Sequence, residues 1–173
     1  MTLNQELELQ KLLKEWRDIR HLSIESQKAG LMGNVCEELS EWYRATNDNE
    51  RVDAMCDVYV FCMNSLKDVA DTREEYELFY KGVHEPRLSN DVKNLMENPY
   101  NDVFIYMLMT AVENIAQKFL GFDFYKAMLE TIKEISSRTG SYDSKIHKFV
   151  KDKSPEAKAK WYSANYDKCR KEI

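Results

Sequence analysis

The chain has 173 residues, of which 43% are hydrophobic and 32% charged, with only 5 glycines and 3 prolines. This length and composition predict one globular domain with a sizeable core, and the scarcity of Gly and Pro favours long helices over a fold with many tight turns. The net charge of −5 argues against broad binding to a nucleic-acid polymer.

Cysteine and histidine usage argues against a zinc site. The four cysteines form no C-x-x-C pair, and the chain has only three histidines. We expect the cysteines near the acidic segment described below to be small buried hydrophobes. The sequence has no signal peptide and no apolar run of about 18 residues, so we expect no membrane partner and a reducing cytoplasm.

Apolar periodicity and capping residues predict an all-α chain without a convincing strand, internal repeat or linker. We expect residues 23–33 to form a polar connection, residues 46–49 and 138–141 to form turns, and residues 82–99 to be less regular. The predicted helices run from 3 to about 22, from 31 or 34 to 45, from the Asn47 cap to about 69, from 72 to 80, from 91 to 96, from 102 to about 120, from the Asp123 cap to about 136, and from Ser154-Pro155 through Trp161 and Tyr166. Residues 1–173 are therefore predicted to form a single domain with a helical bundle as its core.

Acidic side chains border the apolar stripes of two adjacent predicted helices. At roughly 100° per residue, Glu38 lies on the edge of the first stripe, with Glu41 and Glu37 progressively further round. On the second helix Asp53 and Asp57 share one face, and the segment after Asp57 is apolar all round, so we expect it to be buried. A short turn makes the two helices antiparallel, which would bring the acids together across the groove.

Clustered acids on helices are usually a solvated face, but a carboxylate at the core must be paired, hydrogen-bonded or bound to metal. No Lys or Arg occurs between Val52 and Leu66, and Arg51 and Arg44 are the nearest basic residues in sequence. Mg²⁺ prefers a few carboxylates together with water and phosphate oxygens. The pattern therefore favours a site for hydrolysis or transfer at a phosphate, and the absence of G-x-x-x-x-G-K-[ST] excludes a P-loop enzyme.

Three short motifs resemble those of one family. Glu37-Glu38-Leu39-Ser40-Glu41, followed by an acidic stretch ending in Asp57, resembles the E-E-x-x-E…E-x-x-D signature of the all-α nucleoside triphosphate pyrophosphohydrolases, which include the MazG-like proteins and the dimeric dUTPases. The segment Asp57–Asn64 resembles the dimeric dUTPases and the phage dCTPase/dUTPase enzymes. KEISSRTGSY resembles the C-terminal element that contacts phosphates in that branch. The resemblance covers about Leu3–Tyr142 in helix order.

The resemblance implies a helical bundle of the MazG-like/dimeric dUTPase type, here with an extra C-terminal helix. It implies hydrolysis of a pyrimidine dNTP such as dUTP or dCTP to dNMP and pyrophosphate. Mg²⁺, or Mn²⁺ in its place, would be held by Glu38, Glu41 and Asp57, and Glu37 would act as the general base. Lys133 and Arg138 of the third motif would supply cationic contacts to phosphate, and Tyr142 of the same motif would be a further substrate-binding residue.

The chain departs from the family pattern in two places. Ala54 stands where the second glutamate is expected, and Asp53 is the nearest substitute, with Glu50 a further candidate. Ile135 replaces the asparagine of the third motif. These departures leave open whether one metal or two would bind, and whether the chain is active.

Two further residues are candidates for substrate binding, each with a structural alternative. Asn64 can donate and accept, as the edge of a pyrimidine requires, or it can be a satisfied core amide. Gln27 is a candidate nucleotide contact before the first acidic helix. For Lys133 and Arg138 the alternative is ordinary charge at the C-terminal end of a helix.

The sequence leaves two other functions open: a catalytically impaired nucleotide-binding or helical interaction protein of the same fold, and an unrelated bundle whose acids are satisfied by pairing. The apolar predicted helices at Val103–Leu120 and Tyr125–Ile135, and the resemblance, favour a homodimer or homotetramer. Spacing does not rank dUTP over dCTP, and it does not distinguish a bacterial housecleaning enzyme from a phage enzyme.

Overall fold

The computed structural model describes residues 1–145 and 148–172, with the backbone alone at Lys148. Helices form most of the described chain, as the all-α prediction requires. In chain order the elements are α1 (Leu3–Ile19), α2 (Ile24–Arg44), α3 (Asp48–Ser65), α4 (Val69–Phe79), α5 (Leu88–Glu97), α6 (Asp102–Asn114), the π-helical segment η1 (Ile115–Phe119), α7 (Phe124–Ser137), β1 (Gly140–Asp143), β2 (Lys148–Lys151), α8 (Pro155–Lys158) and the 3₁₀ segment η2 (Tyr166–Cys169).

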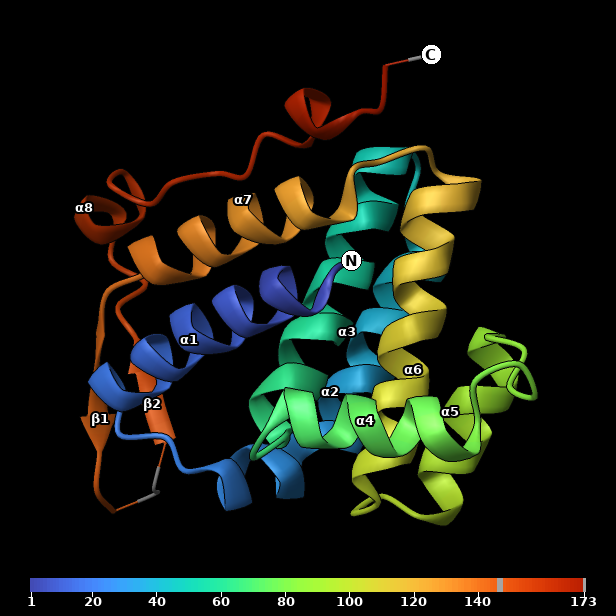
Figure 1. Cartoon of the computed structure of the whole chain (residues 1–173). Helices are drawn as coiled ribbons and strands as arrows, with labels where there is room; N and C mark the ends of the chain where they lie inside the picture. The colour runs from blue at the N-terminus through green and yellow to red at the C-terminus, as the bar shows by residue number, and fades with distance from the viewer. Residues whose placement is uncertain (146–147, 173) are drawn as a thin grey trace.

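Helix α3 lies at the centre of the arrangement (Figure 1). It packs along α2 on one side and along α6 on another, while α4 and α5 contact α6. Helices α1 and α7 lie side by side, and both end near the β1–β2 hairpin (Figure 1). The C-terminal segment then returns along α7, so that η2 contacts both α7 and α3.

The predicted burial of the second half of α3 is confirmed. Beyond Asp57 this helix is apolar on every side, and a helix of that kind must be enclosed. The enclosed side chains include Val58, Tyr59, Val60, Cys62 and Met63. The apolar face of α6 is covered in the same way by the chain's own helices, through Ile105, Leu108, Met109 and Val112.

The predicted caps at Asn47 and Asp123 are present, and Asn101 provides a third cap of the same kind. The side chain of Asn47 accepts a hydrogen bond from the backbone N–H of Glu50 (3.0 Å), and Asp123 accepts one from the N–H of Lys126 (3.2 Å). Asn101 does the same at the start of α6, from the N–H of Phe104 (3.1 Å). Each side chain satisfies one of the N–H groups that a helix start leaves without a partner.

The predicted polar connection at residues 23–33 is wrong, because α2 already begins at Ile24. Ser23 provides its cap by accepting from the N–H of Ser26 (3.1 Å). Gly30 and Gly33 lower helix propensity, but both are exposed and the helix runs through them. The first helix also stops earlier than predicted, since His21 adopts a left-handed φ of 54° and Leu22 N–H bonds back to Arg17 O (3.1 Å).

The boundary between the third and fourth helices also differs from the prediction. Helix α3 ends at Ser65, and α4 begins at Val69 instead of near Thr72. The N-cap of α4 is Asp68, whose carboxylate accepts from the N–H groups of Ala70 (2.8 Å) and Asp71 (3.2 Å). The helix therefore starts at the cap residue Asp68, four residues before the cap candidate Thr72 that was predicted from the sequence.

Two predictions for the C-terminal region are wrong. Gly140–Asp143, predicted in part as a turn, pairs antiparallel with Lys148–Lys151, with Gly140 opposite Lys151 and Tyr142 opposite Phe149. The predicted long terminal helix is confined to Pro155–Lys158. Carboxylates on α7 offer the following segment another way to satisfy its backbone, because Glu134 accepts from Ala164 N–H (2.7 Å) and Glu130 from Asn165 N–H (2.8 Å).

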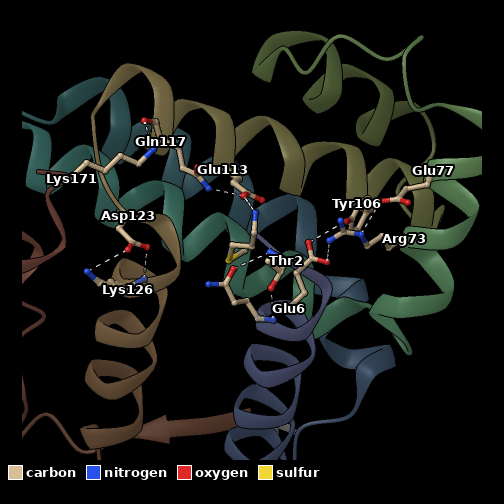
Figure 2. Close-up of polar contacts among 12 residues, drawn as sticks. Thr2, Glu6, Arg73, Glu77, Tyr106, Glu113, Gln117, Asp123, Lys126 and Lys171 are labelled. Atoms are coloured by element: carbon tan, nitrogen blue, oxygen red, sulfur yellow. Dashed lines mark hydrogen bonds and ion pairs between the residues drawn. The ribbon is translucent and has the colours of Figure 1, made fainter. Parts of the chain in front are cut away.

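A buried polar network fixes the N-terminal end of α1 (Figure 2). The Glu6 carboxylate is only 3% exposed and accepts from Arg73 of α4 (2.7 Å) and from the Tyr106 hydroxyl of α6 (3.0 Å). The N-terminal amine forms an ion pair with Glu113. These bonds join α1, α4 and α6 at one end of the fold.

The expectation that the cysteines near the acidic segment are buried is wrong for Cys36. Cys56, Cys62 and Cys169 are buried free thiols, but Cys36 on α2 is exposed. Within residues 1–145 and 148–172, no helix has the length and apolar character needed to cross a membrane.

Candidate metal and phosphate site

Carboxylates from α2 and α3 meet where these two helices pack against each other. Glu38 is buried on α2, while Glu37 and Glu41 of the same helix are exposed. Asp53 and Asp57 on α3 are half-buried. The polar turn at Thr46–Asn47 returns the chain directly, which makes the helices antiparallel and places the α2 and α3 acids close enough for their charges to act on Glu38. We call these five residues the acidic cluster.

Glu38 is the most perturbed member of the acidic cluster. Burial raises the pKa of its carboxyl from 4.5 to about 8, and the charges of Asp57 and Glu41 contribute to that rise, followed by those of Asp53 and Glu37. A carboxylate in this position is costly to ionise unless a cation joins it.

The two aspartates of α3 are perturbed in the same direction. Burial, followed by the charge of Asp53, raises the pKa of Asp57 to about 7, while the guanidinium of Arg138 opposes the rise. Burial also raises the pKa of Asp53, although the Tyr166 hydroxyl donates to its Oδ1 (2.5 Å) and favours the charged form.

Among the side chains that the structure describes, no lysine or arginine neutralises the acidic cluster directly. Among the residues that the structure describes, none of the five carboxylates has a basic side-chain nitrogen within ion-pair distance. Buried charge without a partner is rare in folded proteins and is concentrated at functional sites.

The donor chemistry of the acidic cluster fits a hard divalent cation. All five side chains present carboxylate oxygens, which Mg²⁺ and Mn²⁺ accept together with water and phosphate. As the side chains lie, no three His, Cys, Asp or Glu residues in the described ranges are arranged to enclose an ion. Binding would therefore require these carboxylates to turn inward by side-chain rotation, which exposed Glu37 and Glu41 are free to do.

Two positive side chains act on the acidic cluster from the end of α7 and from the hairpin. We call these residues, Arg138 and Lys151, the cationic border. Arg138 forms an i,i+4 ion pair with Glu134 and lowers the pKa of Asp57 by its charge. Lys151 of β2 acts on Asp57 in the same direction. Glu134, Lys151 and Tyr166 were not identified from the sequence. The i,i+4 spacing of Glu134 and Arg138 could have revealed the first, whereas the other two depend on the path of the C-terminal segment.

Asn64 is a buried amide on α3, seven residues after Asp57 in the sequence. Its Oδ1 accepts from Arg17 of α1 (2.8 Å), so one side of the amide is used by the core. Its Nδ2 has no hydrogen-bond partner among the described atoms. The amide oxygen of Asn64 is therefore hydrogen-bonded and its amide nitrogen is not. The predicted contact with a substrate requires α1 and α3 to separate enough for the substrate to reach that nitrogen.

The remaining predicted contacts lie in three different places. The Lys133 ammonium sits over the Tyr162 ring, 3.7 Å from its centre, and the ring of Tyr142 meets that of His21 edge-on at 5.7 Å. Gln27 is half-buried in the first turn of α2. Eleven residues separate it from Glu38, and at about 1.5 Å per helical residue this is about 16 Å along the axis. Among Gln27 and the three residues of the third motif, Arg138 is the one whose charge acts on the acidic cluster, at Asp53 and Asp57.

A cavity of about 410 Å³ lies between α1, α7 and the hairpin, next to the cationic border. Arg20 lines it, with its guanidinium over the rings of Trp16 (4.7 Å) and Phe149 (4.9 Å). The same guanidinium donates to the backbone oxygens of Ile135 (3.1 Å) and Arg138 (3.0 Å), which fixes the end of α7.

Comparison of the chain with protein-family models, with curated proteins and with solved structures gives no match.

Proposed function

We propose that the chain is a Mg²⁺-dependent nucleoside triphosphate pyrophosphohydrolase that converts a pyrimidine dNTP, such as dUTP or dCTP, to dNMP and pyrophosphate. The observation that carries this proposal is the acidic cluster, whose five carboxylates have no ion-pair partner among the described residues, and in which burial, followed by the charges of the other acids, raises the pKa of Glu38 to about 8. The motif resemblance described above supplies the substrate class.

Each side chain has a role in the proposed reaction. Glu38, Glu41 and Asp57 would hold Mg²⁺, with Asp53 as the further ligand. The bound ion would neutralise negative charge that develops on the phosphate oxygens. Glu37 would take a proton from a water molecule whose oxygen forms the new bond to the α-phosphorus. The bond from that phosphorus to the bridging oxygen would break, and pyrophosphate would leave with the bonding electrons.

The cationic border supports attack at a phosphate. Arg138 and Lys151 act on Asp57 from the side of α7 and the hairpin. Positive side chains placed beside the metal ligands would meet phosphate oxygens that the metal does not reach. Arg138 would have to share its guanidinium with Glu134, its present partner.

A binding function without turnover is the second candidate, and observations at two adjacent positions favour it. Ala54, which stands where the resemblance expects a glutamate, is buried at 2% exposure and offers no ligand. Its neighbour Asp53 is held by the Tyr166 hydroxyl at 2.5 Å. A chain with these features would bind a metal–nucleotide complex and release it unchanged.

Pyrophosphate release distinguishes the two candidates. The purified chain is incubated with each dNTP and Mg²⁺, alongside Glu38→Gln, Asp57→Asn and the exposed control Glu75→Gln on α4. Hydrolysis predicts release from one or two pyrimidine dNTPs, lost in the first two variants and retained in the control. Folded wild-type protein that releases no pyrophosphate from any dNTP contradicts the hydrolase and leaves the binding function.

A further inference from the structure

The hairpin turns one face toward the bundle, and that face carries Lys151. Side chains alternate along a strand, so Phe149 and Lys151 of β2 point to the same side. Phe149 lies against Arg20 of α1, with 4.9 Å between the guanidinium carbon and the ring centre, which identifies this side as the one that faces the bundle. Val150, on the opposite face, is 46% exposed, and Lys151 at the end of the strand is also exposed to solvent.

Gly140 allows the two strands to pass closely at Lys151. The two residues are paired in the ladder, and a Cβ built at Gly140 would lie 2.2 Å from Val150 O and 2.8 Å from the Phe149 ring. Only glycine fits there without a shift of the strands. The position of Lys151 beside the end of α7 is therefore fixed by backbone geometry.

Positive charges gather around Lys151, and Arg138 among them is paired with Glu134. Burial, followed by the charge of Arg138, lowers the pKa of Lys151, and Lys153 and Arg20 add to the effect. Within the part of the chain that the structure describes, neither Lys151 nor Arg20 forms an ion pair. Arg20 is 5% exposed and donates to carbonyl oxygens instead.

The acid that faces this group is Asp57, whose charge opposes the lowering of the Lys151 pKa. Cations that repel one another beside unpaired carboxylates suit a ligand that brings charges of both signs. A metal-bound polyphosphate is such a ligand, since its metal meets the acids while its free oxygens meet the cations.

We propose that Lys151 is a substrate-binding residue that contacts the phosphate oxygens of the departing pyrophosphate. The proposal rests on the proposed function for its substrate and extends the site to a strand that no sequence motif had identified. The ammonium of Lys151 is a compact charge on a long flexible stem, which can follow the phosphates as they leave.

The test measures binding of inorganic pyrophosphate to the full chain by calorimetry, in Mg²⁺ buffer. Lys151→Gln is compared with Lys145→Gln, an exposed lysine at the turn end of the same hairpin that loses the same charge. Losing one charge-assisted hydrogen bond is expected to weaken pyrophosphate binding roughly 10-fold in Lys151→Gln. Lys145→Gln is expected to match the wild type, and thermal melts verify that both variants are folded.

Three outcomes overturn the inference: wild-type protein that does not bind pyrophosphate, unchanged affinity in Lys151→Gln, or equal weakening in both variants. The result is separate from that for the proposed function. A Lys151-dependent pyrophosphate site in a chain that hydrolyses no dNTP upholds the inference and contradicts the hydrolase. Hydrolysis of a dNTP together with unchanged pyrophosphate affinity in Lys151→Gln upholds the hydrolase and contradicts the inference.

Discussion

Glu38 carries the largest electrostatic cost in the acidic cluster, because it is buried and the charges of the other four acids act on it. The folded chain holds the Glu38 proton with a pKa of about 8, against an ordinary value of 4.5. The folded state therefore binds the proton more tightly than the unfolded chain. Stability that is present below pH 4.5 is lost as the pH rises toward 8.

Glu38→Gln is expected to stabilise the metal-free chain at pH 8, because glutamine keeps the shape of the side chain and removes the buried charge. The gain is on the order of a few kcal/mol, or roughly 5 °C in melting temperature. Thermal melts in EDTA at pH 8 and pH 5 provide the measurement, and the gain should shrink at pH 5. A melting temperature at pH 8 that is no higher than that of Glu75→Gln would contradict this account of Glu38.

At the scale of elements, the hairpin depends on Gly140. Gly140→Ala places a methyl group 2.2 Å from a backbone oxygen of the partner strand, so the strands must separate. We expect a loss of roughly 1–3 kcal/mol in the free energy of unfolding, as for other overpacked sites. Hydrogen exchange at β1 and β2 should quicken in the same variant.

Gly33→Ala is the matched control for this prediction. Gly33 is an exposed residue of α2, and a Cβ there meets nothing within 4 Å. Alanine should raise the free energy of unfolding by about 0.5–1 kcal/mol through helix propensity alone. Urea unfolding compares the two variants, and equal destabilisation in both would show that crowding at Gly140 is not the cause.

The sequence predicted most helices and failed where tertiary contacts decide local structure. Asn47 and Asp123 predicted their caps because a cap depends on a side chain and an N–H three residues away. The hairpin was missed because strands of four residues carry little alternation. The segment after Lys158 was predicted as helix, but Glu130 and Glu134 satisfy its backbone from a different element.

The acidic cluster shows the same division. Local spacing identified Glu38, Glu41 and Asp57 as acids beside a buried stripe, and in the structure the charges of Glu41 and Asp57 act on Glu38. Local spacing could not identify Lys151 or Tyr166, because both are brought near the acidic cluster only by the path of the chain after α7. Asn64 was predicted as a substrate contact, and its bond to Arg17 of α1 is a contact that no periodicity reveals.

At the scale of the whole molecule, the network in Figure 2 joins α1, α4 and α6. Glu6→Ala would leave Arg73 and Tyr106 without their shared carboxylate at a buried position. Breaking such a pair from one side is expected to cost roughly 3 kcal/mol. Chemical denaturation with exposed Glu15→Ala as the control measures the loss, and a cost no greater than that of the control would show that the network contributes little.

Magnesium binding tests the central claim, that the acidic cluster is a divalent metal site. Isothermal titration of Mg²⁺ into the chain without nucleotide compares the wild type with Asp57→Asn and Glu75→Gln, both of which keep side-chain volume. We predict binding in the wild type and in Glu75→Gln, and a loss of roughly 10-fold or more in affinity for Asp57→Asn. Equal affinity in all three proteins, or no binding in the wild type, would contradict the account.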